Sequence, residues 1–324
     1  MPGPLAPPDK RLLSACWIRS GCDKCARHAG LASLSMSLID PPVITHPIIT
    51  RAFVTIDEGQ IHLRRMEGSG TPLLLLHASP ASGWFSQPLM QALRAAGHEG
   101  PILAPDTLGN GDSAAPAPDH PDIAYFAGSM VRMLDALGMD KVDVYGTHTG
   151  ARIACEMAAA YPERVRRVVL DGITEYDDEL RAAVIENYAP RVEPDAYGRH
   201  LIWAFNFCRD QALFFPHFMQ DAGHRLSVPM PPPEILHRIT LDVLKSWDTY
   251  SLPYIAAFEY RAFDRMALVA APTLLLKPET ELALLNASVA RALEILSDGR
   301  AASLPPGDAA KAAAILAFLK GEEA

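Results

Sequence analysis

Residues 141–164 read KVDVYGTHTGARIACEMAAAYPER, and this stretch decides how the chain is expected to fold. Residues 142–145 alternate apolar and polar side chains, as a strand does, and Gly146-Thr147-His148-Thr149-Gly150 follows. Beyond this turn, apolar residues recur at helical spacing until Pro162. Glycines on both sides of a tight turn permit a strained backbone and close packing of strand against helix. The stretch therefore predicts a strand, a sharp turn that presents His148, and a helix.

Strand and helix signals alternate on both sides of this stretch. Strands are expected at 52–56, 60–65, 73–77, 101–105, 167–170, 272–276 and 301–304, and helices at 85–96, 122–137, 287–296 and 308–319. The run of four leucines from Leu73 is typical of a strand that is buried on both faces. Strands that alternate with helices predict an α/β fold with a doubly wound, mostly parallel sheet.

The alternation stops between residues 174 and 266. This segment contains helical stretches, proline-rich loops and many aromatic residues, and it shows no convincing strand. We expect an inserted helical region here, between two parts of one core at 50–173 and 267–324. Residues 1–49 lack apolar periodicity and open with four prolines in eight residues, which predicts a disordered extension and lead-in. Met36 is an alternative start of the protein.

Composition narrows the possible partners. The 324 residues carry a net charge of -9, with 49% hydrophobic and 21% charged residues. An acidic balance disfavours nucleic acid and anionic membrane surfaces, and no apolar run approaches the ~20 residues of a membrane span. The five cysteines form no disulfide framework, which favours a reducing, cytoplasmic location. The oligomeric state leaves no signal in the sequence.

Neither a metal nor another cofactor is expected. Cys22 and Cys25 with His28 make half of a zinc site, but no matching second pair follows. No Gly-x-Gly-x-x-Gly or P-loop pattern places a nucleotide, and no HExxH or paired His–carboxylate spacing supports a metal at His148. The expected partner is a small-molecule substrate.

Several motifs together resemble the α/β-hydrolase superfamily, from about residue 50 to the end of the chain. They are His77-Ala78-Ser79-Pro80, Pro105-Asp106 with Gly109, Gly111 and Ser113, the turn around His148, Tyr161-Pro162-Glu163-Arg164-Val165, and Ala271-Pro272-Thr273-Leu274-Leu275-Leu276. The turn resembles the family's nucleophile elbow, Gly-x-Ser-x-Gly. The resemblance implies the α/β-hydrolase fold, with residues 174–266 as a helical cap that shapes the substrate pocket.

The resemblance also implies roles for the loop that begins at His77. In the family, backbone N–H groups of such a loop and of the residue after the nucleophile form the oxyanion hole. The corresponding groups here are those of Ala78, Ser79 and Thr149. The side chains expected to line the pocket are His77, Trp84 and Asp106.

Two departures from the family pattern concern the catalytic triad, which runs nucleophile, acid, histidine along the chain. His148 occupies the nucleophile's position, as in a subset of the superfamily that carries Gly-x-His-Thr-Gly at the elbow. No histidine occurs after His237, and the loop after the last expected strand reads Pro305-Pro306-Gly307-Asp308. The chain thus lacks both the nucleophile and the base of the Ser-His-acid machinery.

The imidazole of His148 can act as general base, general acid, hydrogen-bond donor, metal ligand or nucleophile. A carboxylate beside it would orient the ring, and Asp171 at the end of the next strand is the expected partner of a dyad. Glu279 and Glu281 follow Leu276, the family's usual acid position, either as acids or as surface glutamates. The catalytic candidates are therefore His148, Asp171 and Glu281.

Two functions of different classes remain open. The first is an enzyme that hydrolyses a small ester, lactone or carbon–carbon bond, or performs a lyase-type proton transfer, with His148 as acid or base. The second is a catalytically degenerate protein of the same fold that binds a small ligand. A carboxylate within hydrogen-bond reach of His148 favours the enzyme, whereas purely apolar neighbours favour the binding protein.

Overall fold

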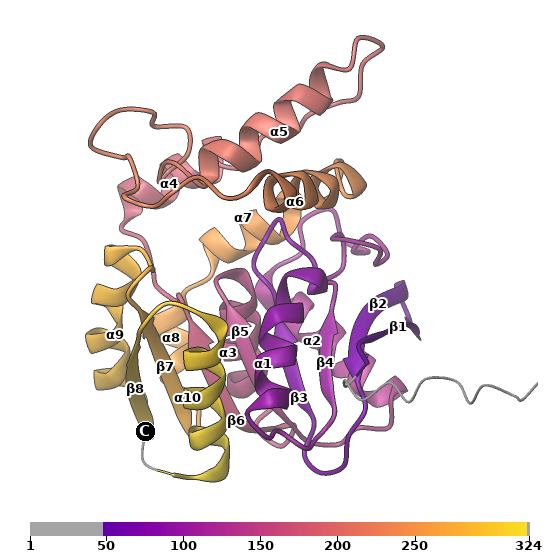
Figure 1. Cartoon of the computed structure of the whole chain (residues 1–324), viewed down its shortest axis with the longest axis vertical. Helices are drawn as coiled ribbons and strands as arrows, with labels where there is room; N and C mark the ends of the chain where they lie inside the picture. The colour runs from indigo at the N-terminus through magenta and orange to yellow at the C-terminus, as the bar shows by residue number, and fades with distance from the viewer. Residues whose placement is uncertain (1–47, 323–324) are drawn as a thin grey trace, which may run out of the picture. The chain divides into compact units, whose positions relative to one another are not determined.

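The computed structural model describes residues 48–322, which form one sheet with helices on both faces (Figure 1). The strands are β1 (Thr50–Ile56), β2 (Gly59–Met66), β3 (Leu73–Leu76), β4 (Ile102–Pro105), β5 (Val142–Thr147), β6 (Val165–Asp171), β7 (Thr273–Pro278) and β8 (Gly299–Leu304). Predictions for residues 1–47, including the extension, Met36 and the half zinc site, lie outside the described residues.

The eight strands follow the order β1-β2-β4-β3-β5-β6-β7-β8. The β1–β2 and β2–β4 pairs are antiparallel, and every other pair is parallel. This confirms the predicted doubly wound, mostly parallel sheet. β5 lies between β3 and β6 near the middle, so the turn that carries His148 leaves the sheet at its carboxyl edge, where open α/β sheets bind ligands.

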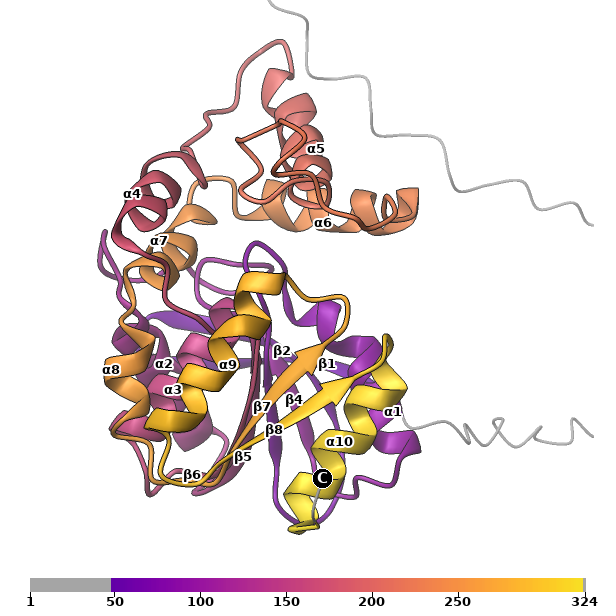
Figure 2. The ribbon, with the colours of Figure 1, turned by 90° about the vertical axis from the view of Figure 1, so that its left-hand side faces the viewer.

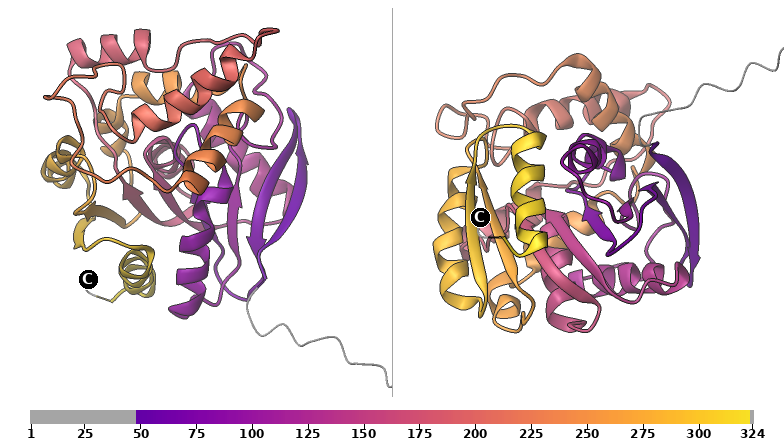
Figure 3. Two further views of the ribbon diagram at one scale, coloured as in Figure 1. Left: turned by 45° about the horizontal axis from the view of Figure 1, so that its top comes forward. Right: turned by 60° about the horizontal axis from the view of Figure 1, so that its bottom comes forward.

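The sheet separates two hydrophobic cores. Figures 1 and 3 show helices on both faces of the sheet. The helices beside the sheet are η1 (a 3-10 turn, Gly83–Ser86), α1 (Gln87–Ala95), α2 (Ile123–Ala136), α3 (Thr149–Ala160), α8 (Ala262–Met266), α9 (Ala283–Ile295) and α10 (Asp308–Lys320). One core joins the sheet to α2, α3 and α8, and the other joins it to α1 and α10. All four leucines of β3 are fully buried, as their unbroken apolar run indicated.

The segment between β6 and α8 contains α4 (Asp178–Asn187), α5 (Arg199–Gln211), α6 (Pro233–Lys245) and α7 (Ser251–Glu259). We call residues 174–266 the insertion. None of the eight strands of the described sheet comes from it. Its aromatic side chains form a hydrophobic cluster of their own around Tyr188, Phe207, Tyr250 and Tyr254. In Figure 2, α4, α5 and α6 lie together at one end of the sheet.

Three hydrogen bonds fasten the insertion to loops of the sheet. Ser82 Oγ donates to Asp242 Oδ2 at 2.8 Å, Lys245 Nζ to Asp112 Oδ1 at 2.6 Å, and Thr249 Oγ1 to the Gly109 carbonyl at 2.8 Å. These loops follow β3 and β4. The polar face of α6 therefore lies against the loop that carries the predicted oxyanion residues. Within residues 48–322, none of the helices is both long and apolar enough to cross a membrane.

Candidate functional site

The backbone of His148 adopts a conformation that side chains rarely take. Its φ is 50° and its ψ is -107°, and among the described non-glycine residues it alone has a positive φ. Helix α3 starts at the next residue, and the His148 amide donates to the Asp171 carbonyl at 2.9 Å. Such strain persists only where the surroundings hold it, and it is concentrated at functional sites. The turn therefore presents the imidazole at the N-terminus of α3.

The two glycines of the turn are required by close approach. A Cβ at Gly146 would lie 2.1 Å from the Gly150 carbonyl oxygen. A Cβ at Gly150 would lie 2.2 Å from the carbonyl oxygen of Leu76, at the end of β3. Both contacts are with backbone atoms that cannot move aside. The Gly-x-His-x-Gly pattern is therefore a packing requirement of strands β3 and β5 against α3.

The imidazole of His148 forms an ion pair with Glu281. The distance from His148 Nε2 to Glu281 Oε2 is 3.2 Å. Glu281 follows β7, and its other oxygen accepts the Leu282 N–H at 2.8 Å. Gly172 leaves room for the pair, since a Cβ there would lie 3.0 Å from Glu281 Oε2 and 3.2 Å from His148 Cε1. Three consecutive strands, β5, β6 and β7, thus build this contact.

Each member of the pair shifts the pKa of the other toward the charged form. Burial lowers the pKa of His148, but the hydrogen bond and charge of Glu281 and the charge of Asp171 outweigh it, so the pKa is raised. Burial raises the pKa of Glu281, but His148, the Leu282 N–H and the charge of Lys311 outweigh it, so the pKa is lowered. The His148 side chain is 41% exposed, which leaves the imidazole accessible to solvent.

The expected pairing of His148 with Asp171 is wrong. The Asp171 carboxylate instead accepts from the Tyr145 hydroxyl at 2.7 Å and from Lys311 Nζ at 2.6 Å. The reason is the alternation of side chains along β6. Val169 and Asp171 point toward α1 and α10, whereas Leu170 points toward α3. Of the three catalytic candidates, the structure brings His148 and Glu281 into contact and ties Asp171 to α10.

The predicted oxyanion loop lies against the start of α3. The Ser79 N–H donates to Thr149 Oγ1 at 3.4 Å, so the two residues are neighbours, but this hydrogen bond occupies the Ser79 amide that an oxyanion hole would use. The Ser79 hydroxyl is buried and has no hydrogen-bond partner among the described residues. Within residues 48–322 no basic side chain is hydrogen-bonded to this hydroxyl, so no described group activates it as a nucleophile. The use of the Ala78, Ser79 and Thr149 amides as an oxyanion hole stays a prediction.

His77 is a structural residue rather than a pocket residue. It is 1% exposed, and its Nε2 accepts the Thr107 N–H at 2.9 Å. The proton therefore sits on Nδ1, which donates to the Ala78 carbonyl at 2.9 Å. Burial lowers the pKa of this imidazole. The neutral ring fixes the loop after β3 from within the core, which corrects the expectation that it lines the pocket.

Asp106 is also buried, at 1% exposure, and its carboxylate fastens the loop after β4. It accepts from the Gly83 N–H at 2.8 Å and the Asp112 N–H at 2.9 Å, and it pairs with His62 and Arg64. With these donors around it, Asp106 is not free to contact substrate, again contrary to the pocket expectation. Trp84, the third residue expected in the pocket, is half-buried beneath the Arg238 guanidinium, 5.0 Å from its ring centroid.

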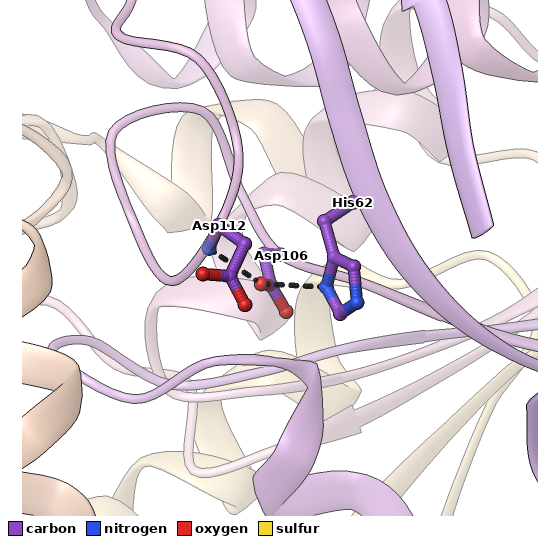
Figure 4. Close-up of side chains that lie close together, drawn as sticks. All are labelled: His62, Asp106 and Asp112. Carbon is purple, nitrogen blue, oxygen red and sulfur yellow. Dashed lines mark hydrogen bonds and ion pairs between the residues drawn. The ribbon is translucent and has the colours of Figure 1, made fainter. Parts of the chain in front are cut away.

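Figure 4 shows that the side chains of His62, Asp106 and Asp112 converge. One nitrogen or oxygen atom of each side chain, of the kind that can bind a metal, lies within 4.8 Å of the others. His62 Nδ1 lies 2.9 Å from Asp106 Oδ2, and the same oxygen accepts the Asp112 amide. The Asp112 carboxylate pairs with Lys245 Nζ. Hydrogen bonds and one lysine therefore account for this cluster, which joins β2 to the loop after β4.

Sequence reasoning missed Arg152, one helical turn after His148. It is 4% exposed and donates to the His148 carbonyl at 3.1 Å and to the Thr174 carbonyl at 3.0 Å. The guanidinium therefore links the strained turn to the segment after β6. Its one signal in the sequence is an arginine at the buried i+4 position of a helix otherwise rich in alanine.

This architecture is similar to that of known proteins. Residues 71–199 match the family model described as alpha/beta hydrolase fold. This chain has the α/β-hydrolase fold. Epoxide Hydrolase A from Mycobacterium thermoresistibile superposes with a TM-score of 0.63 at 20% identity, covering 85% of this chain and 99% of that one. A bromoperoxidase from Bacillus anthracis gives a TM-score of 0.64 at 20% identity, covering 84% of this chain and 100% of that one. These likenesses confirm the fold.

Curated relatives share shorter segments, and they are hydrolases. The 2-hydroxymuconate semialdehyde hydrolase of Pseudomonas putida is 38% identical over 112 residues, which are 33% of this chain and 37% of the relative. The bifunctional epoxide hydrolase 2 of Mus musculus is 37% identical over 127 residues, which are 37% of this chain and 22% of the relative. The matches thus span well under half of these relatives.

Proposed function

We propose that this chain is a hydrolase of a small organic substrate in which the His148–Glu281 pair replaces the serine-based triad. The observation that carries the proposal is the carboxylate 3.2 Å from an imidazole held in the strained turn. Two further observations support it. Among the described residues no base is hydrogen-bonded to the Ser79 hydroxyl, and the relatives that match a segment of this chain are hydrolases.

The chemistry follows from which ring nitrogen is used. Glu281 engages Nε2, and the hydrogen bonds of the described residues leave Nδ1 of His148 without a partner. In its neutral form the ring would take a proton from water through Nδ1 while the water oxygen bonds to the substrate carbonyl carbon. The imidazolium so formed is stabilised by Glu281. The Thr149 backbone amide, and the Ser79 amide once it exchanges Thr149 Oγ1 for the substrate, would stabilise the oxyanion.

In the second step the leaving group departs and the proton is returned. The carbon–leaving-group bond breaks as the tetrahedral oxyanion collapses, and the imidazolium returns its proton to the leaving group. No covalent enzyme intermediate forms, so one histidine serves as base and then as acid. An ester, a lactone or a carbon–carbon bond next to a carbonyl fits this scheme. A lyase-type reaction would use the proton transfer alone.

A ligand-binding protein is the second candidate, and one observation favours it. The raised pKa of His148 keeps a larger share of the ring protonated near neutral pH, which suits a donor to a bound anion more than a base. The two candidates differ in what happens after the small molecule has bound. In the enzyme the His148 imidazolium gives its proton to the leaving group, whereas the binding protein leaves its ligand unchanged.

The deciding experiment is a turnover assay on small esters, lactones and 2-hydroxymuconate semialdehyde, the compound named in the relatives. Wild type, His148→Ala and Glu281→Gln are compared, with His120→Ala at an exposed loop histidine as the control. We expect His148→Ala to lower kcat by about 10²–10⁴-fold, the contribution typical of a general acid–base group, and His120→Ala to have no effect. Turnover that survives His148→Ala unchanged would contradict the mechanism. Binding without turnover of any compound would favour the second candidate.

A further inference from the structure

A second charged cluster lies beside the site, on the face of the sheet that α10 covers. Lys311, in the N-terminal part of α10, places its Nζ 2.6 Å from Asp171 Oδ2. The Tyr145 hydroxyl donates to the same oxygen at 2.7 Å, and Lys311 Nζ lies 3.4 Å from that hydroxyl. The side chains of Asp171 and Lys311 are 2% and 23% exposed. A carboxylate, a phenol and an ammonium thus meet where β5 and β6 end.

Lys311 is the charge partner of Asp171. The second oxygen of Asp171 is buried and has no hydrogen-bond partner among the described residues. Burial, and then the charge of Asp171, raise the pKa of Tyr145 well above its usual range, so the phenol stays neutral and donates. Without Lys311, a buried carboxylate would keep a single neutral donor, which is a costly arrangement.

The cluster reaches His148 through the backbone. The Asp171 carbonyl accepts the His148 N–H at 2.9 Å. Asp171, the ion-pair partner of Lys311, therefore also holds the strained turn through its backbone. The next residue, Gly172, packs against the imidazole and Glu281. A continuous path therefore runs from α10 through the Lys311–Asp171 ion pair and the Asp171 peptide to His148.

The cluster also reaches His148 through charge. The negative charge of Asp171 raises the pKa of His148, and the positive charge of Lys311 lowers that of Glu281. The other charged groups that act on the two clusters are Arg152 of α3, whose charge lowers the pKa of His148, and Asp308 at the start of α10, whose charge raises that of Tyr145. Lys311 is the cation among them that contacts Asp171 directly.

We propose that Lys311 is a positioning residue for the active site: it clamps Asp171 from α10, and through Asp171 it fixes the backbone and the electrostatic environment of His148. The inference rests on the proposed role of His148 in the reaction. Lys311 does not contact the imidazole, so it acts through Asp171. Its effect is therefore sought in proton binding by His148, which can be measured whether or not a substrate is known.

The test is an NMR titration of the His148 imidazole in wild type, Lys311→Met, Lys311→Arg and the double variant Lys311→Met/Asp171→Asn. In Lys311→Met the charge of Asp171 is no longer balanced, and we expect the pKa of His148 to rise by about half a unit. Lys311→Arg keeps the charge and restores the wild-type value. Lys320→Met removes a positive charge from the exposed far end of α10, about 13 Å along the helix, and should change nothing.

The double variant keeps the test valid if Lys311→Met folds poorly. It removes both charges, so no uncompensated buried carboxylate remains and thermal stability recovers. The charge of Asp171 is among the causes that raise the pKa of His148, so in the double variant this pKa should fall below the wild-type value. An identical His148 titration in all variants, even with altered melting temperatures, would overturn the proposal and leave Lys311–Asp171 as a purely structural pair. The titration does not depend on turnover, so its result would stand even if the protein proved to have no hydrolase activity.

Discussion

At the scale of single residues, the site depends on one side chain in an unfavourable backbone conformation and on the glycines around it. The sequence predicted the place of His148 because the glycine spacing of the turn is a local requirement. It could not choose between Asp171 and Glu281. That choice depends on which face of β6 a side chain takes and on how the chain turns after β7, and neither leaves a pattern in the sequence.

Gly172 gives a prediction at this scale. An alanine Cβ there would lie 3.0 Å from Glu281 Oε2 and 3.2 Å from His148 Cε1, at a φ of +73°. We expect Gly172→Ala to push the pair apart, so the pKa of His148 should fall toward its ordinary value of 6.5. NMR titration measures the shift. Gly138→Ala is the matched control, because its φ is +66° and its Cβ would meet no atom within 4 Å.

Both glycine variants should lose about 1–2 kcal/mol of stability to the positive φ, whereas only Gly172→Ala should change the titration. Equal His148 pKa values in the two variants would show that Gly172 is not what makes room for the pair.

At the scale of helices and strands, the sequence predicted most elements because their buried faces have clear periods. The predicted helix 287–296 is instead α9, which begins at Ala283. Its N-cap is Leu282, which has no capping side chain, so the usual start signal is absent. The hydrogen bonds that join α6 to the loops after β3 and β4 could not be predicted either. Ser82 and Asp242 are 160 residues apart, and nothing in the sequence indicates that they pair.

The Ser82–Asp242 hydrogen bond gives a prediction at the element scale. Both residues are 2% exposed, and burial raises the pKa of Asp242, although the Ser82 hydroxyl counteracts this. Ser82→Ala leaves the buried carboxylate without that donor, and we expect a loss of about 1–3 kcal/mol in urea unfolding. Asp112→Asn breaks the more exposed Lys245–Asp112 pair and should cost about 1 kcal/mol or less. A larger loss in Asp112→Asn would show that the surface pair anchors α6 instead.

At the scale of the whole molecule, four segments distant in the sequence converge at the carboxyl edge of the sheet. They are the turn after β5, the end of β6, the segment after β7 and the first part of α10. The strand order of the doubly wound sheet brings them together. The predicted fold was therefore enough to locate the site, whereas the chemistry of the site depends on which side chains meet there. The superfamily's usual machinery needs an activated serine, and this arrangement offers an imidazole–carboxylate pair instead.

Fluorophosphonate labelling tests that difference. These reagents bond to a hydroxyl that a nearby base activates. The Ser79 hydroxyl is buried and without a partner among the described residues, and His148 stands in the nucleophile's position. We expect no stoichiometric labelling of the wild type, and none after His148→Ser, because that variant adds a hydroxyl without a base. Mass spectrometry that finds one phosphonylated serine in the wild type would return the protein to the serine hydrolases.

The most direct measurement of the central claim is the pH dependence of kcat/KM for a substrate found in the turnover assay, in wild type and in Glu281→Gln. If neutral His148 is the base, kcat/KM rises with pH through the pKa of His148, which Glu281 holds above its ordinary 6.5. Glu281→Gln removes the charge that favours the imidazolium, so the inflection should move to lower pH. It should also match the His148 pKa that NMR gives for each protein. An inflection that stays in place in Glu281→Gln, or that differs from the His148 pKa, would contradict the account.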